Sequence, residues 1–98
     1  MKKVEDTLAE RGAVYGDYSD GLVDRATIMA VLKEAHIKAH GHEMPGIHQG
    51  MLWDIVNKLC RLAVTPDHVD SWHDIIGYAT LAEQIVGEAH ADRYRSRT

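Results

Sequence analysis

The sequence predicts an all-α fold, a small bundle of three main helices preceded by a short N-terminal helix. Apolar residues recur at spacings of three and four along most of the chain, the period of an amphipathic helix. Glycine and proline interrupt that pattern between the predicted helices, and no segment shows the apolar–polar alternation typical of a strand. We therefore expect a single helical domain over 1–98, with a less ordered tail from about residue 91.

The first two predicted helices are each delimited by a glycine. A short helix is expected over 4–11, ended by Gly12. The second should begin at Ser19 or Asp20 as N-cap and end at Gly41. Its apolar residues cover much of its circumference, so we expect this helix to be largely buried.

The last two predicted helices are joined by a short segment that contains a proline. The third is expected over about 47–63, with apolar residues on one side and charged residues on the other. Thr65 followed by Pro66 predicts the start of the fourth, with Thr65 as cap and Pro66 at the first helical position. Asp70 is a second candidate cap, and the helix should continue to about His90.

Composition and charge exclude several classes of protein. The formal net charge of −4 gives no electrostatic footprint for broad nucleic-acid binding. No apolar run approaches the roughly 20 residues that span a bilayer, and the single cysteine, Cys60, suits a reducing compartment. We expect a cytoplasmic protein without a membrane partner. Because so small a bundle often completes its core with a second copy, we also expect a homo-oligomer.

Polar residues form a stripe on each of the last two predicted helices. The stripes consist of Asp54, Lys58 and Arg61 on the third helix and of Asp70, Asp74 and Tyr78 on the fourth. In antiparallel neighbouring helices these stripes face each other. They then form either interhelical salt bridges or a nucleotide site, in which carboxylates hold Mg²⁺ and the cations neutralise phosphate.

Seven histidines raise the question of a transition-metal site. The candidate groups are His36, His40 and His42, or His48, His68 and His73. None has the His-Glu-x-x-His arrangement or a cysteine partner, and histidines on helix faces are common, so the sequence disfavours a zinc site.

Three segments of the chain together resemble known protein families. They are 10–17, with Tyr15-Gly16-Asp17; 57–62, with Lys58 and Arg61; and 67–79, with Asp70, Asp74 and Tyr78. This combination resembles a group of small phage-encoded proteins of unassigned function and the nucleotide-modification-associated domain of phages and bacteria. More distantly, it is similar to the MazG-like all-α nucleoside triphosphate pyrophosphohydrolases.

The MazG-like resemblance implies a bundle that binds Mg²⁺ through carboxylates on two helices and hydrolyses a nucleotide between its α and β phosphates. On this chain it implies Asp54, Asp70 and Asp74 as metal ligands and catalytic groups. The family pairs Glu-x-x-Glu with Glu-x-x-Asp, whereas here the third helix offers Asp54 alone, and fewer carboxylates bind Mg²⁺ more weakly. The implied phosphate and nucleotide contacts are Lys58, Arg61, Tyr15, Asp17 and Tyr78.

The resulting expectation is a phage-type accessory protein, in the cytoplasm of the host, that binds or hydrolyses a nucleotide. If it is an enzyme, it should be a Mg²⁺-dependent pyrophosphohydrolase. The alternatives are a non-enzymatic module that sequesters a nucleotide-derived signal, and a protein that binds and modulates a host protein through an exposed helix face.

Overall fold

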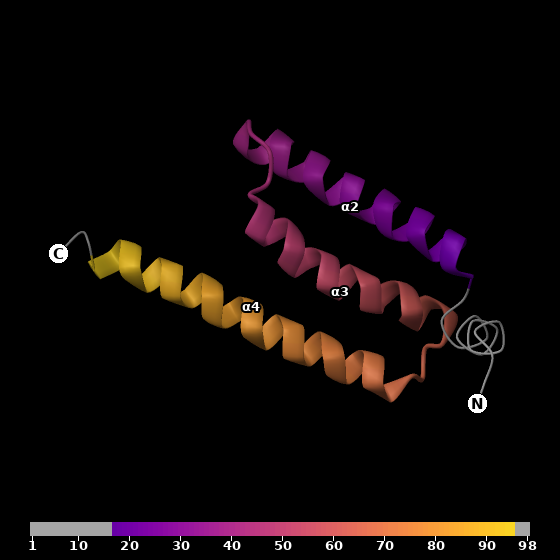
Figure 1. The fold of residues 1–98 in the computed structure, drawn as a ribbon. Helices are drawn as coiled ribbons and strands as arrows, with labels where there is room; N and C mark the ends of the chain where they lie inside the picture. Colours follow the sequence, from indigo (N-terminus) through magenta and orange to yellow (C-terminus); the bar gives the residue numbers. More distant parts are fainter. Residues whose placement is uncertain (1–16, 96–98) are drawn as a thin grey trace, which may run out of the picture.

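The computed structural model describes residues 17–95, which form three helices and no strand. Helix α2 spans Tyr18–His40, α3 spans Gly46–Val64 and α4 spans Val69–Arg95. Each helix runs antiparallel to the one before it (Figure 1). The all-α class and the three main helices are therefore confirmed, whereas the short helix expected over 4–11 lies outside the described residues.

Helix α2 is capped at both ends by residues that satisfy its free backbone groups. The Asp17 carboxylate accepts hydrogen bonds from the amides of Ser19 and Asp20, at 2.9 and 3.2 Å. The expected cap at Ser19 or Asp20 was thus wrong, because Asp17 has the extended backbone of an N-cap and both later residues lie in the first turn. At the other end Gly41 adopts φ 74° and donates its N–H to the Ile37 carbonyl, which confirms the predicted end.

The connection between α3 and α4 is a turn over 65–68, and the predicted start of α4 was wrong. The Thr65 amide closes α3 on the Arg61 carbonyl, so Thr65 ends one helix instead of beginning the next. The Pro66 carbonyl accepts a hydrogen bond from the Trp72 indole at 2.9 Å. Asp70 does not act as the cap either, since it lies inside the first turn of α4. There its charge favours the helix dipole.

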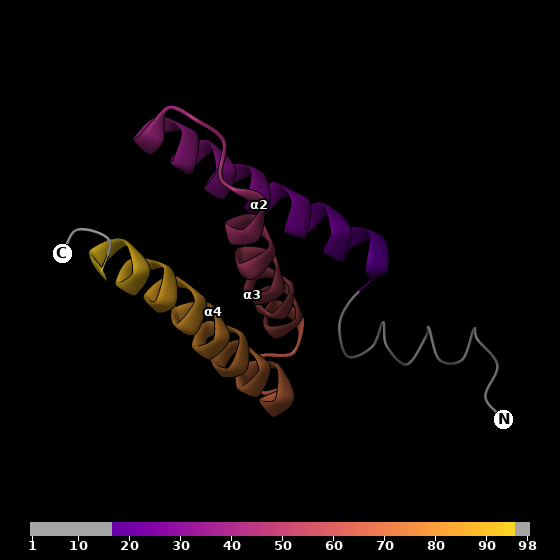
Figure 2. The ribbon, with the colours of Figure 1, turned by 60° about the vertical axis from the view of Figure 1, so that its left-hand side comes forward.

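Helix α3 lies between α2 and α4 and makes the extensive helix–helix contacts with both (Figures 1 and 2). The apolar side chains buried in the described part of the chain come mostly from α3 and from the segment that connects α2 to it. They are Met29, Met44, Val56 and Leu62. Lys58 and Ser71 are also buried, so the core formed by residues 17–90 is small and partly polar.

Much of the apolar surface of α2 and α4 remains accessible to solvent. Met29 is the buried residue of α2, and the expectation that this helix is largely buried was wrong. On α4, Val69, Trp72 and Ile76 are 73%, 51% and 64% exposed. Among the described residues, α2 and α4 each pack on α3 and no further layer covers them, which leaves this surface open. Within 17–95, no helix combines the length and apolarity needed to cross a membrane.

The left-handed turn at Gly41 should be sensitive to a side chain. We expect Gly41→Ala to lower the free energy of unfolding by about 1 kcal/mol, because an L-residue is strained at positive φ. An added Cβ has nothing within 4 Å, so a steric clash does not contribute. Urea denaturation followed by circular dichroism measures the change. Gly87→Ala, in the exposed part of α4, is the control and should stabilise the protein by about 0.5–1 kcal/mol. Equal effects of the two substitutions would contradict the left-handed turn.

Candidate functional site

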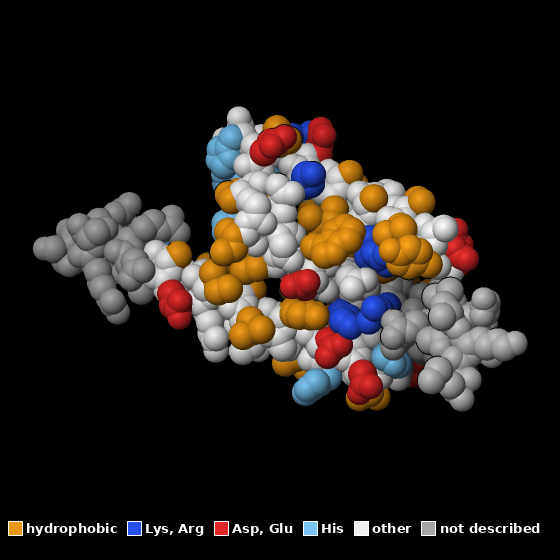
Figure 3. Space-filling view, viewed as in Figure 1, with side chains coloured by type: hydrophobic (Ala, Val, Ile, Leu, Met, Phe, Trp, Pro, Cys, Tyr) orange, Lys and Arg blue, Asp and Glu red, His pale blue; other side chains and the backbone are white. Residues whose placement is uncertain are grey.

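A salt bridge joins α3 to α4 at the place where the sequence puts the two polar stripes together. Lys58 Nζ lies 2.8 Å from Asp74 Oδ2. Lys58 is 9% exposed, although its charge normally requires water, and its ammonium therefore depends on this carboxylate. Figure 3 shows charged side chains of both signs beside each other near the seam between α3 and α4. The predicted facing of Lys58 and Asp74 is confirmed.

The environment of Asp74 favours its ionised form. The hydrogen bond from Lys58 is the largest cause of a lowered pKa for the Asp74 carboxyl, and the charges of Lys58, His73 and Arg61 act in the same direction. Partial desolvation opposes them. Because the folded state holds this pKa below its usual value, the ion pair stabilises the fold at neutral pH and loses its effect in acid.

The other residues expected on the two stripes lie on the same two helices as this pair. Arg61 is half-buried on α3 and adds positive potential at Asp74. Tyr78 is half-buried on α4, one turn beyond Asp74. Asp70 is exposed in the first turn of α4, and Asp54 is exposed on α3. No ion pair joins Asp54 to Lys58 within the described residues.

Two residues expected to contact a nucleotide come from the segment before α2. Asp17 uses its carboxylate to cap α2, so this group is already engaged by two backbone amides. Tyr15 lies outside the described residues. The contact between Tyr15 and a nucleotide therefore stays a prediction.

The described residues do not present a ready magnesium site. Among them, no three histidine, cysteine or acidic side chains are grouped so that they could hold a metal ion. Asp74 is bound to Lys58, and Mg²⁺ requires several oxygen ligands in octahedral geometry. In the described residues Asp54, Asp70 and Asp74 are thus not grouped as metal ligands, and Mg²⁺ binding by this set stays a prediction.

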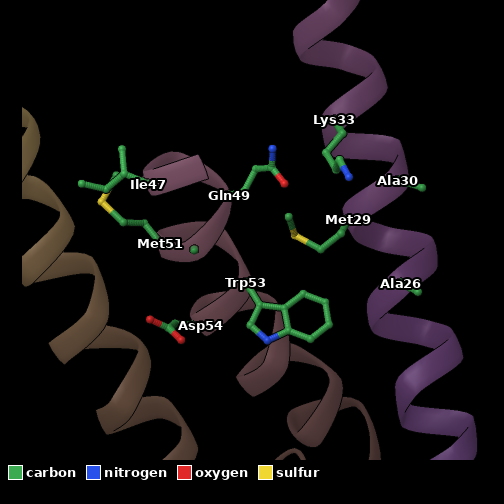
Figure 4. A pocket seen from close by; sticks show the side chains of 10 residues that line it. Ala26, Met29, Ala30, Lys33, Ile47, Gln49, Met51, Trp53 and Asp54 are labelled. Atoms are coloured by element: carbon green, nitrogen blue, oxygen red, sulfur yellow. The ribbon is translucent and has the colours of Figure 1, made fainter. Parts of the chain in front are cut away.

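A shallow groove of about 810 Å³ lies over α2 and α3, and neither Lys58 nor Asp74 lines it. It is lined by apolar and polar side chains in the combination typical of small-molecule sites. The lining residues used below are Met29, Lys33, Gln49, Trp53 and Asp54. Figure 4 shows Trp53 and Gln49 from α3 and Met29 and Lys33 from α2 between the two helices, with Asp54 on the side of α3 that faces α4.

A cation lies near the aromatic ring of this groove. The guanidinium carbon of Arg25 is 5.9 Å from the centre of the Trp53 ring, within the range of a cation–π contact. Arg25 and Lys33 are eight residues apart on α2, with Met29 midway, so all three share one stripe of the helix. Both cations consequently lie on the edge of α2 that faces the groove.

This groove was missed by the sequence analysis, although a signal for it exists. Arg25, Met29 and Lys33 follow one another at intervals of four, and so do Gln49 and Trp53. Met29 was included in the apolar face of this helix, whereas Arg25 and Lys33 were not considered. Only the packing of α2 on α3 shows that the stripe borders a groove.

Comparison with known proteins gives a family without an assigned activity. Residues 1–86 match the family described as a domain of unknown function, DUF6378. No curated protein and no solved structure matches the chain.

The contribution of the Lys58–Asp74 pair to stability should depend on pH. We expect Asp74→Asn to destabilise the protein at pH 7, because it leaves the buried Lys58 ammonium without its carboxylate. The difference from the wild type should shrink as the pH falls below about 4, the usual pKa of an aspartate, and vanish below the lowered pKa of Asp74. Urea denaturation at several pH values measures this. Asp54→Asn, at an exposed site on the same seam, should change stability little at any pH. A difference for Asp74→Asn that persists at pH 2 would contradict the ionic explanation.

Proposed function

The chain belongs to the DUF6378 family, and for this member we propose that it binds a nucleotide in the groove lined by Lys33, Gln49 and Trp53. The observation that carries the proposal is the combination, in one groove, of an exposed aromatic ring with cations at its edge. The resemblance to the nucleotide-modification-associated domain and to the MazG-like enzymes supports the same class of ligand.

The chemistry of the groove suits the two ends of a nucleotide. Trp53 is 39% exposed and offers an indole face on which a base can stack, a contact worth about 1–3 kcal/mol per base. Lys33 and Arg25 offer positive charge for phosphate. A negatively charged ligand can thus stack its base on Trp53 of α3 and place its phosphates near the cations of α2.

Two polar side chains indicate how a nucleotide is oriented in the groove. The Gln49 amide donates a hydrogen bond to the Met44 carbonyl at 2.6 Å, which fixes the side chain and leaves its oxygen as an acceptor. Asp54 lies at the opposite side of α3 (Figure 4), where its carboxylate repels phosphate. We therefore place the phosphates toward Lys33.

The proposal concerns binding and does not include hydrolysis, since the carboxylates of the described residues form no metal-holding group. Hydrolysis by a Mg²⁺-dependent mechanism is tested in the same experiment as a separate outcome. Binding of a host protein instead of a nucleotide is the alternative that remains if all nucleotides fail.

We further propose that the protein is a homodimer whose subunits meet along α4. Val69, Trp72 and Ile76 are spaced by three and four and form an exposed apolar stripe. Ser71, Asp74 and Tyr78 occupy the side of α4 turned toward α3, so the stripe is free to contact another chain. A second copy fits because the stripe is uncharged, which suits contact between two chains of net charge −4. The described residues of one copy also form only a small core.

Nucleotide binding is tested by calorimetric titration of the full chain with nucleoside mono-, di- and triphosphates and cyclic dinucleotides, with and without Mg²⁺. We expect at least one of these ligands to bind. Lys33→Ala should weaken its binding by about tenfold, a loss of roughly 1.4 kcal/mol. Lys38→Ala, at an exposed lysine on the same helix outside the groove, is the control and should leave affinity unchanged.

Three outcomes would contradict parts of this proposal. Absence of binding by every nucleotide would overturn it. Equal affinities of the Lys33→Ala and Lys38→Ala proteins for the nucleotide would show that it does not bind in the groove. Release of pyrophosphate or phosphate, detected in the same mixtures with Mg²⁺, would show that the protein is an enzyme.

The dimer is tested by light scattering coupled to size exclusion. We expect the wild type to have twice the mass of one chain and Ile76→Glu to be a monomer, because a buried carboxylate without a partner opposes association. Val23→Glu is the matched control, since Val23 is 64% exposed, as Ile76 is, but lies on α2. It should remain a dimer. A monomeric wild type, or dissociation by both substitutions alike, would overturn the interface on α4.

A further inference from the structure

Three histidine rings lie close together where α2 turns toward α3. The ring centres of His36 and His40 are 4.4 Å apart, those of His36 and His42 are 5.2 Å apart, and those of His40 and His42 are 5.9 Å apart. Figure 3 shows histidine side chains together at this end of the molecule. None of the three belongs to the Lys58–Asp74 pair or lines the proposed nucleotide groove.

A helix period and a left-handed turn bring the three rings together. His36 and His40 are four residues apart, so their rings project from neighbouring turns of α2 on the same face. Gly41 at φ 74° then ends the helix, and the ring of His42 comes within 5.9 Å of both others. Three titratable groups are thus held at the point where the chain leaves α2.

One of these rings borders an apolar cavity at the junction of the three helices. His36 is half-buried and lines a cavity of about 330 Å³. Met44 of the connection, His48 and three apolar side chains of α3, and Ala82 and Val86 of α4 line the same cavity. His36 Nε2 is buried and has no hydrogen-bond partner among the described residues. The end of α2 therefore meets α3 and α4 through a polar ring in largely apolar surroundings.

Only the neutral form of His36 suits this position. A neutral imidazole carries a proton on one nitrogen, so Nε2 can stay unprotonated, whereas an imidazolium has an N–H at both nitrogens. The buried Nε2 would then be a charged donor without an acceptor, which is costly. Burial is accordingly the largest cause of a lowered pKa for the His36 imidazole. Protonation thus requires this nitrogen to reach water.

The titratable groups around His36 increase this cost in acid. His40 on α2, His42 on the connection and His48 on α3 all lower the pKa of His36, because like charges repel. The α4 side chains that line the cavity are uncharged. Within residues 17–90, no carboxylate forms an ion pair with any of these histidines. Their positive charges are therefore not neutralised by a neighbouring acid.

The two exposed rings can take up protons before His36 does. His40 and His42 lie at the C-terminal end of α2, where the helix dipole favours a positive charge. His42 Nδ1 lies 2.8 Å from the Glu43 carbonyl oxygen, a contact in which Nδ1 donates in both protonation states. Both charges then act on His36, whose ring is half-buried between them and the cavity.

We propose that the end of α2, with its connection to α3, is a pH-sensitive switch that opens in mildly acidic solution as His36 leaves the cavity. Near pH 7.5 histidines are mostly neutral, and the rings can pack together. Because the pKa of His36 is lower in the closed form than in the open form, the closed form loses stability as the pH falls below about 6.5. The Lys58–Asp74 pair responds only below about pH 4, so the two effects are separable.

The test is amide hydrogen exchange of the full chain at pH 7.5 and pH 5, read by mass spectrometry, with labelling times scaled for the intrinsic effect of pH on exchange. We expect protection of residues 33–44 to fall at least about threefold at pH 5, while residues 52–62 in the middle of α3 keep theirs. His36→Leu places an apolar side chain that does not titrate beside the cavity. It should keep residues 33–44 protected at pH 5.

Two further proteins separate the switch from general acid destabilisation. His40→Gln changes an exposed side chain and removes the nearest charge, so it should reduce the acid-induced loss in part, even if His36→Leu folds poorly. His73→Gln, at an exposed histidine of α4, should lose protection as the wild type does. Equal protection of residues 33–44 at both pH values in the wild type would overturn the proposal. So would a loss shared by all three helices, or an undiminished loss in His36→Leu and His40→Gln.

Discussion

The position of α3 between α2 and α4 is the constraint on which the rest of the described structure depends. Both extensive helix pairings include α3, so its side chains must serve two neighbours at once. Val56 and Leu62 do so as apolar residues, but Lys58 between them is charged and buried. The Asp74 carboxylate is therefore part of the packing of α4 on α3, and its ionised state is tied to the fold.

The sequence was sufficient where a local pattern decides the outcome. The end of α2 followed from Gly41, because few residues other than glycine adopt its left-handed conformation. The pairing of Lys58 with Asp74 followed from helical spacing and a short connection. The beginnings of α2 and α4 did not follow. Several capping residues occur in succession there, and tertiary contacts such as the bond from Trp72 to Pro66 decide among them.

For the candidate sites, the sequence predicted which residues share one face of a helix, but not how close residues on different helices lie. The stripes with Asp54, Asp70 and Asp74 were identified, but the distances between carboxylates on different helices depend on packing. The groove at Trp53 likewise arises between two helices. The charged seam thus depends on the packing of α4 on α3, and the aromatic groove depends on the packing of α2 on α3.

The open, consecutive arrangement of the helices also has a consequence for how the chain reaches its structure. Each helix packs mainly on the helix that follows or precedes it in the sequence, joined by a short turn. Contacts of this kind close short loops, and helical topologies dominated by them fold on the microsecond-to-millisecond scale. An α2–α3 hairpin can accordingly form before α4 has left the ribosome.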